Sequence, residues 1–323
     1  MYFVSFYHVS SFSSFESNGR HIGGFTECSA SYMKKERSSS ISIALVGDIM
    51  MDRGVRSMTD IHGGGDYGFI TRYLDFLNEY DIVFGNLEGP LSDKGQDLGG
   101  KYSFRMDPSA LNALLDVNFS ALSVANNHAG DWGKEAFHDT VLRLREAGIA
   151  VVGGGEDIVD AQRTSVIDID GHTVGFVGFN DVGAHWMEAG ADTPGILMAI
   201  SDYHDDVIKK ARREVDTLIV SYHFGDEYMP EPNERQRALA TRAVDLGADI
   251  IAGHHPHVIQ PVEILSGSVI AYSLGNFIFD QYFSKETMEG SVLVVTIENG
   301  EISFEEMIVE LTDRFQPRLR IDQ

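Results

Sequence analysis

The stretch that decides the fold is residues 41–48, Ile-Ser-Ile-Ala-Leu-Val-Gly-Asp. Its first six residues form a short apolar run rich in β-branched side chains, which is typical of a buried strand. Gly47 and Asp48 then end the run with a small residue and a carboxylate. Ligands of open α/β sheets bind just beyond the carboxyl ends of strands, so Asp48 stands where a functional group is expected.

Further apolar runs follow along the chain, and segments with helical apolar spacing separate them. We predict strands at 82–84, 119–124, 149–152, 217–221, 250–252 and 269–274. We predict helices at 69–77, 134–147, 205–215 and 235–246, and a further helix that Asp107 caps and Pro108 begins.

Two turn dipeptides predict β-hairpins. Asp170-Gly171 joins strands at 165–169 and 173–179, and Asn299-Gly300 joins strands at 292–297 and 302–311. Strands that alternate with helices, together with these hairpins, predict an α/β protein whose mixed sheet is covered by helices on both faces.

The length of 323 residues allows one large domain, which we assign to residues 41–323. Residues 1–40 are interpreted as a disordered tail or a misassigned start. The first 32 residues lack the basic start and continuous apolar run of a signal peptide, and Met33 resembles a natural chain start. No stretch reaches the roughly 18 apolar residues of a spanning helix, so we expect no direct membrane span and a soluble, cytoplasmic protein.

Charge and cysteine content exclude several classes of site. The net charge of −24 argues against nucleic acid as a ligand, because binding to phosphates needs a basic surface. A single cysteine, Cys28, excludes an internal disulfide and a cysteine-rich zinc module. An anionic substrate would therefore need local cations or a metal ion to overcome the field of the protein.

Nearly every predicted core strand ends in a cluster of small or polar residues. These clusters contain carboxylate, amide and imidazole groups: Gly47-Asp48, Gly85-Asn86-Leu87-Glu88, Asn126-Asn127-His128, His223, Gly253-His254-His255-Pro256-His257 and Gly275-Asn276. This mixture suits a divalent ion such as Mn, Fe or Zn. Two ions roughly 3.5–4 Å apart would activate water and stabilise an oxyanion.

Each cluster taken alone also has a structural explanation. A Gly-Asp pair at a strand end is commonly a turn or a helix cap, and His223 alone is typical of a buried, hydrogen-bonded histidine. Three imidazoles within residues 254–257 have little structural use, however, and the clusters occur together. We therefore predict a metal site to which Asp48, Glu88, Asn127, His223 and two of the three histidines contribute. His128 could protonate a leaving group, and Asp131 could orient it.

Six motifs, in order, resemble those of the CapA family of poly-γ-glutamate capsule biosynthesis proteins, which is related to the calcineurin-like metallophosphoesterases. The motifs are residues 47–50 (Gly-Asp-Ile-Met), 85–88 (Gly-Asn-Leu-Glu), 125–128 (Ala-Asn-Asn-His) with Asp131 and Gly133, 222–225 (Tyr-His-Phe-Gly) with Glu227 and Tyr228, 253–258 (Gly-His-His-Pro-His-Val) and 273–277 (Ser-Leu-Gly-Asn-Phe). The resemblance covers residues 41–310. It implies a four-layer α/β sandwich with mixed sheets, metallophosphoesterase-like, and a two-metal centre.

The resemblance also implies roles for individual residues. The implied metal ligands are Asp48, Glu88, Asn127, His223, His255 and His257, and His128 would be the acid or the stabiliser of the transition state. The chain departs from the phosphoesterase pattern at Met50, where a histidine is usual, at Glu88, where an aspartate is usual, and at His254, which directly follows the glycine. We therefore expect one or two ions, and His254 is an alternative to His255.

Substrate contacts are predicted at six residues near these motifs. They are Arg53, Lys101, Arg105, Glu227, Tyr228 and Asn276. The three cations could meet an anion, although a plain surface position would also explain each of them. The expected partner is an anionic polymer or a small anionic substrate, with other capsule-synthesis subunits as further candidates.

Three functions fit the sequence. The first is a metal-dependent hydrolase of a phosphoester or γ-glutamyl bond. The second is a non-catalytic polymer-binding or assembly subunit of a poly-γ-glutamate synthesis and export complex, which the loss of a ligand at Met50 favours. The third is a soluble relative with an unrelated small substrate. Members of the family often carry an amino-terminal membrane anchor, and we do not transfer that property to this chain.

Overall fold

The computed structural model describes residues 40–320, which contain two large sheets and one small sheet. The eight-stranded sheet has the order β16-β15-β14-β1-β2-β3-β4, and β13 also pairs with β1. Its strands are β1 (Ser40–Ile49), β2 (Ile82–Leu87), β3 (Phe119–Ser123), β4 (Ala150–Val152), β13 (Asn276–Ile278), β14 (Glu289–Glu298), β15 (Glu301–Leu311) and β16 (Pro317–Leu319).

The six-stranded sheet has the order β11-β12-β10-β9-β7-β6. Its strands are β6 (Ser165–Ile169), β7 (His172–Asn180), β9 (Thr217–His223), β10 (Ile250–His254), β11 (Val262–Leu265) and β12 (Ser268–Ala271). The small sheet pairs β5 (Gly154–Gly155) with β8 (Gly195–Ile196). Both large sheets mix parallel with antiparallel pairs, as the alternating sequence pattern predicts.

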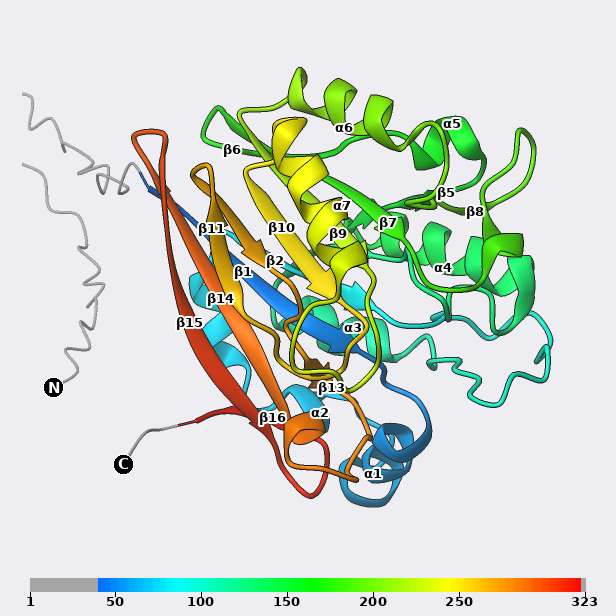
Figure 1. The fold of residues 1–323 in the computed structure, drawn as a ribbon. Coiled ribbons are helices and arrows are strands. Elements are labelled where there is room, and N and C mark those ends of the chain that lie inside the picture. The colour runs from blue at the N-terminus through cyan, green and yellow to red at the C-terminus, as the bar shows by residue number, and fades with distance from the viewer. Residues whose placement is uncertain (1–39, 321–323) are drawn as a thin grey trace, which may run out of the picture. The chain divides into compact units, whose positions relative to one another are not determined.

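Helices cover the outer face of each large sheet. Their bounds are α1 (Arg53–Gly63), α2 (Gly68–Thr71), α3 (Ala110–Asp116), α4 (Gly133–Glu146), α5 (Ile158–Ala161), α6 (His204–Arg212) and α7 (Glu234–Asp245), with short 3-10 helices η1 (Asp75–Glu79), η2 (His185–Met187) and η3 (Glu286–Met288). The first four helices share a core with the eight-stranded sheet, and α5 to α7 share one with the six-stranded sheet. Figure 1 shows α6 and α7 lying over β7, β9 and β10.

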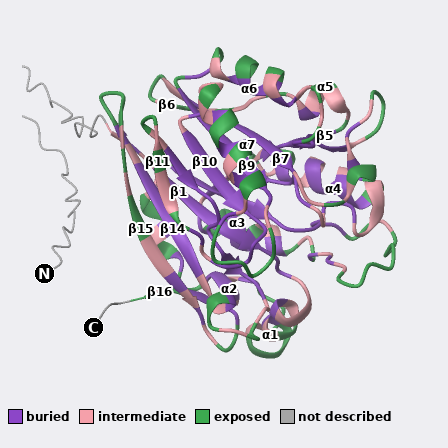
Figure 2. Cartoon of the chain, viewed as in Figure 1, coloured by how far each residue is buried: buried purple, intermediate pink, exposed green. Residues whose placement is uncertain are grey.

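The inner faces of the two sheets pack on each other. Ile43 and Leu45 of β1 join Val174 of β7 and Ile250 of β10 in one buried apolar cluster. Figure 2 shows that the central strands of both sheets are buried, whereas the helices expose one side. The predicted four-layer α/β sandwich with mixed sheets is confirmed. The interpretation of one sheet with helices on both faces is wrong, because a strand buried between two sheets has the same apolar sequence as one buried between helices.

Both predicted hairpins form. Asp170 and Gly171, with φ of 53° and 94°, join β6 to β7, and Asn299 and Gly300, with φ of 53° and 82°, join β14 to β15. Consecutive left-handed residues match the twist of paired strands, so these dipeptides fix the register.

The predictions for two early helices are wrong in detail. The segment 69–77 divides into α2 and η1, with Leu74 between them at φ −101°. Spacings of three and four residues suit either helix type in so short a segment. Asp107 accepts hydrogen bonds from Ser109 in a turn, and the helix starts only at Ala110. Helix α1 was not predicted.

Two glycines let the strands meet where the site lies. A Cβ atom on Gly47 would lie 2.0 Å from the Gly275 carbonyl oxygen, and one on Gly253 would lie 2.1 Å from that of Tyr272. Only glycine fits such close backbone approach. Asp48 and His254 follow these two glycines directly, so the packing of the strand ends fixes their positions.

The described residues, 40–320, belong to one compact unit. The interpretation of residues 1–40 as a tail or misassigned start lies outside the described residues, except that Ser40 is the first residue of β1. Within residues 40–320, no helix has the length and apolar character needed to cross a membrane.

Candidate metal centre

Strand register brings the predicted ligands to one edge of both sheets. Asp48 is the register partner of Asn86 in β2 and of Asn276 in β13. In the other sheet, His223 at the end of β9 is paired with His254 at the end of β10. These strands run in parallel within each sheet, so their carboxyl ends place the polar clusters together (Figure 1).

The eight-stranded sheet supplies two carboxylates. The side chains of Asp48 and Glu88 are fully buried. Asn86 donates a hydrogen bond from Nδ2 to Asp48 Oδ1 over 2.8 Å, and the main-chain N–H of Glu88 donates to the Ile49 carbonyl over 2.8 Å. Both acids are therefore held in place by the strand that neighbours their own.

The six-stranded sheet supplies imidazoles. His223 Nε2 lies 2.7 Å from Asn127 Oδ1 and 3.2 Å from His255 Nδ1. His257 lies between the two acids, with Nδ1 3.2 Å from Asp48 Oδ2 and Nε2 3.6 Å from Glu88 Oε1. One carboxylate oxygen from each of Asp48 and Glu88 and one nitrogen of His257 lie within 4.8 Å of one another.

Burial is the largest influence on the pKa of each group, but the outcome differs between them. It raises the pKa of Glu88 to about 7 and lowers those of His255 and His254 to about 3 and about 4. At His257, the nearby charges of Glu88 and Asp48 outweigh burial and raise the pKa to about 9. Burial is likewise outweighed at Asp48, where the His257 hydrogen bond and charge lower the pKa. The acids thus attract positive charge to the centre.

The donor set fits a divalent cation. Glu88 Oε1 is buried and has no hydrogen-bond partner among the described residues, which is costly for a carboxylate oxygen. His255 and His257 have φ of 99° and 58°, a strained conformation for non-glycine residues that is common at functional sites. Oxygen and imidazole donors without thiolate suit Mn, Fe or Zn. All six implied ligands lie in this one cluster.

His128 and Asp131 form a pair beside the ligands. His128 Nδ1 lies 2.7 Å from Asp131 Oδ2, and its Nε2 lies 3.8 Å from Glu88 Oε1. The main-chain N–H of Phe104 donates to the same Asp131 oxygen over 2.9 Å, and the Phe104 ring packs against the imidazole at 4.1 Å between centroids. The ring of His128 is thus held on its edge and on its face.

A cavity of about 290 Å³ opens onto these groups. Its lining includes Arg53, Phe104, His128, Glu227, Tyr228, His257 and Asp280, with Tyr102 and Gln281 to Phe283. Arg53 pairs with Asp280, and its guanidinium carbon lies 4.6 Å from the centre of the Phe104 ring. Of the predicted substrate residues, Arg53, Glu227 and Tyr228 therefore face this cavity.

The other predicted substrate residues lie elsewhere. Lys101 is exposed, next to the Tyr102 ring, and does not line the cavity. The Arg105 guanidinium hydrogen-bonds main-chain oxygens of Asp93 and Lys94 and covers Trp132. Asn276 is fully buried, and its Oδ1 lies 3.0 Å from His257 Nδ1, where it orients that ring.

Met50 brings apolar packing where the phosphoesterase pattern has a histidine. It is fully buried with Phe104 and Phe279 in a small cluster of its own. The Phe279 ring lies 4.8 Å from that of His257, so this cluster supports both His128 and His257.

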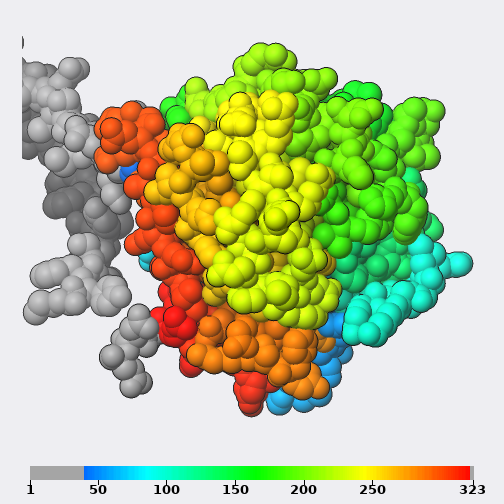
Figure 3. Space-filling model, viewed as in Figure 1, coloured from blue at the N-terminus to red at the C-terminus, as the bar shows by residue number. Residues whose placement is uncertain are grey.

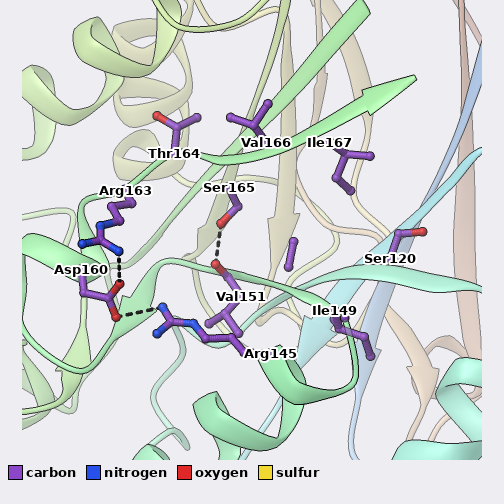
Figure 4. Close-up of a pocket in the computed structure, with 12 residues that line it drawn as sticks. Ser120, Arg145, Ile149, Val151, Asp160, Arg163, Thr164, Ser165, Val166 and Ile167 are labelled. Atoms are coloured by element: carbon purple, nitrogen blue, oxygen red, sulfur yellow. Dashed lines mark hydrogen bonds and ion pairs between the residues drawn. The ribbon is translucent and has the colours of Figure 1, made fainter. Parts of the chain in front are cut away.

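A larger cavity, of about 630 Å³, lies near the amino ends of β3 and β4. Figure 4 shows its two arginines, Arg145 and Arg163, both paired with Asp160. Arg145 also pairs with Glu156, so both cations have carboxylate partners, and the predicted ligands lie at the opposite strand ends. Size alone therefore does not mark the functional site.

Three residues that shape the centre had no role predicted from the sequence. Asn86 contacts Asp48 and lies 3.4 Å from His223 Nδ1, while Asn126 donates to Asn86 and accepts from the His128 N–H. Both asparagines belong to the strand-end clusters of the sequence, and that position is the signal by which they could have been assigned to the site. Phe104 belongs to none of the motifs, and nothing in the sequence marked it.

The fold and the site together define a class: four-layer α/β proteins with a candidate metal centre at the strand ends. The model of the family described as "Bacterial capsule synthesis protein PGA_cap" matches residues 42–281, and the chain belongs to that family.

Similar proteins include the PGA biosynthesis protein CapA of Bacillus subtilis, 37% identical over 82% of this chain and 70% of that protein. The capsule biosynthesis protein CapA of Bacillus anthracis is 34% identical over 83% of this chain and 67% of that protein. The crystal structure of a hypothetical protein from Thermus thermophilus superposes with a TM-score of 0.51 and 17% identity. The superposition covers 84% of this chain and 99% of the Thermus chain. That likeness is one of fold alone.

Proposed function

We propose that the protein acts in poly-γ-glutamate capsule synthesis as a metal-dependent hydrolase. The observation that carries this proposal is the buried Glu88 oxygen without a hydrogen-bond partner among the described residues, set among donors of Asp48 and His257. A structural core has no need of such a carboxylate, since burying a carboxylate oxygen without a hydrogen bond costs stability. The names of the Bacillus relatives support the biological setting.

The residues of the chain divide into ligands and a proton donor. Asp48, Glu88, Asn127, His223, His255 and His257 would hold one or two divalent ions. A bound ion would act as a Lewis acid that activates water and stabilises developing negative charge. His128 faces the same cavity, and Asp131 contacts its Nδ1, which leaves Nε2 on the side of Glu88. That nitrogen would give its proton to the leaving group.

The substrate would be an anion that binds beside Arg53 and the aromatic rim of the cavity. Arg53 provides a cation in the lining, although Asp280 already pairs with it. Both a phosphoester and a γ-glutamyl amide have an electrophilic centre that activated water attacks, so we propose both bonds for testing.

Metal content per chain tests the proposal first. The protein is purified without chelator or histidine tag, and Mn, Fe and Zn are measured by elemental mass spectrometry. We expect one or two equivalents, together with hydrolysis of a chromogenic phosphoester or a γ-glutamyl peptide that chelator abolishes and added metal restores. Protein that takes up none of these metals, even after loading, would refute the hydrolase.

An assembly or polymer-binding subunit is the second candidate. It is favoured by Tyr282 and Phe283, which expose 75% and 63% of their surface beside the cavity. Large exposed aromatics are typical of binding surfaces. Protein that binds metal and poly-γ-glutamate but hydrolyses neither class of bond would support this candidate instead.

A further inference from the structure

Glu227 lies close to two of the implied metal ligands. It belongs to the loop after β9, whereas His223 ends that strand. One of its carboxylate oxygens lies within 4.8 Å of nitrogens of both His255 and His257. Unlike those two buried histidines, Glu227 is exposed, and it lines the cavity. Its carboxylate therefore approaches the centre from the cavity, on the solvent side.

The backbone holds Glu227 near this position. The N–H of the next residue, Tyr228, donates to the Pro256 carbonyl over 2.8 Å, which ties the Glu227 loop to the loop of the ligand histidines. Tyr228 has a φ of 63° and Gly225 one of 96°, so the loop turns sharply on both sides of Glu227. Figure 3 shows this yellow-green segment at the molecular surface.

The charge of Glu227 distinguishes two roles, a free carboxylate in the cavity and a carboxylate bound to metal. A free carboxylate in the cavity would repel an anionic substrate at close range. Asp48 and Glu88 provide only two negative charges at the buried side of the centre, and Met50 adds no donor there. A third carboxylate bound to metal would balance more of the charge of one or two divalent ions.

We propose that Glu227 is a metal ligand that closes the solvent side of the centre and that an anionic ligand displaces on binding. This inference rests on the proposed metal centre and replaces the direct substrate contact that the sequence predicted for Glu227. The exposed side chain is free to leave, whereas the buried ligands remain in place. Entry of an anion would thus be coupled to the release of one protein carboxylate.

Two substitutions separate ligation from simple charge. Glu227→Gln removes the charge, and Glu227→Asp keeps it but shortens the side chain by one methylene. Mn²⁺ binding is measured by calorimetry on the full chain, and orthophosphate is then titrated into the Mn²⁺-loaded protein. Glu231→Gln, an exposed residue of the same loop outside the ligand clusters, is the matched control.

We expect both Glu227 variants to bind Mn²⁺ about tenfold or more weakly and to bind orthophosphate more tightly than wild type. The control should leave both affinities within about twofold, because its charge lies outside the ligand clusters. If Glu227→Asp behaves as wild type while Glu227→Gln does not, charge alone acts and the ligand role is refuted. Unchanged Mn²⁺ affinity in both variants refutes it as well. Wild-type protein that binds no Mn²⁺, Fe or Zn would instead contradict the proposed function itself.

Discussion

Two buried carboxylates, Glu88 in the metal centre and Asp139 in helix α4, have opposite surroundings. Asp139 accepts hydrogen bonds from Ser92 over 2.6 Å and Arg143 over 2.7 Å, and Lys94 lies 2.7 Å from its other oxygen. Burial works against its charged form, but these three partners outweigh burial and lower its pKa to about 2. Glu88 Oε1 has no hydrogen-bond partner among the described residues, its contacts to His257 and His128 being longer, at 3.6 and 3.8 Å, and burial raises the pKa of Glu88 to about 7.

This difference distinguishes a carboxylate that stabilises the fold from one that serves the function. A carboxylate with partners on both oxygens stabilises the fold, whereas a buried carboxylate with one oxygen that accepts no hydrogen bond destabilises it. Such a residue persists where a ligand completes it. The comparison predicts that the two acids respond oppositely to removal of their charge.

Glu88→Gln should produce the largest effect. Metal affinity should fall by more than roughly 100-fold, since a charged ligand becomes a neutral amide with poorer donor strength. The free energy of unfolding of metal-free protein should stay within about 1 kcal/mol of wild type or rise, because a buried acid whose Oε1 lacks a hydrogen bond is removed. Calorimetric metal titration and urea unfolding measure the two quantities. A large loss of stability with metal binding intact would reverse the roles assigned to the two acids.

His128→Ala tests a residue of the centre that does have partners. Turnover of the metal-loaded protein should fall by about 10²- to 10⁴-fold, the usual contribution of a general acid, with metal content unchanged. Asp131→Asn should cause a smaller loss, because it disturbs only the orientation of the ring. Equal loss of metal and turnover in His128→Ala would mean that His128 is a ligand rather than a proton donor.

Asp139→Asn should lower stability and leave the metal centre intact. A pKa of about 2, against an ordinary value of 3.8, corresponds to about 2 kcal/mol of unfolding free energy. Because the folded-state pKa is lowered, this stabilisation is complete above about pH 4 and is lost as the pH falls through 2. Urea unfolding of variant and wild type should therefore differ at pH 7 and converge toward pH 2. A constant difference over that range would show that packing, not charge, stabilises the site.

The sequence predicted the strand ends better than the arrangement of the layers. Gly47-Asp48 and Gly253-His254 mark strand ends by local chemistry, and Asp170-Gly171 fixes a hairpin by its own φ preference. Whether a buried strand faces a helix or a second sheet depends on contacts across the whole chain. The inner core that joins Leu45 to Ile250 therefore has no local signature.

The candidate site shows the same division. The grouping of its implied ligands could be predicted because each one lies at or just after the end of a strand, whereas Phe104 supports His128 from a loop and carries no motif. Its contribution arises only from folding, which brings it against Asp131 and His128.

His254→Leu should have the smallest effect. Burial lowers the pKa of His254 to about 4, so its ring is neutral at pH 7, and neither ring nitrogen has a hydrogen-bond partner among the described residues. Its Nδ1 lies 3.6 Å from Asp48 Oδ1, beyond hydrogen-bond distance. Leucine has a similar volume, so unfolding free energy should change by less than about 1.5 kcal/mol and metal affinity by less than about tenfold. If metal affinity instead falls as far as in Glu88→Gln, then His254 is itself a ligand in place of His255, and its unpaired nitrogens, like the Glu88 oxygen, are kept for the metal.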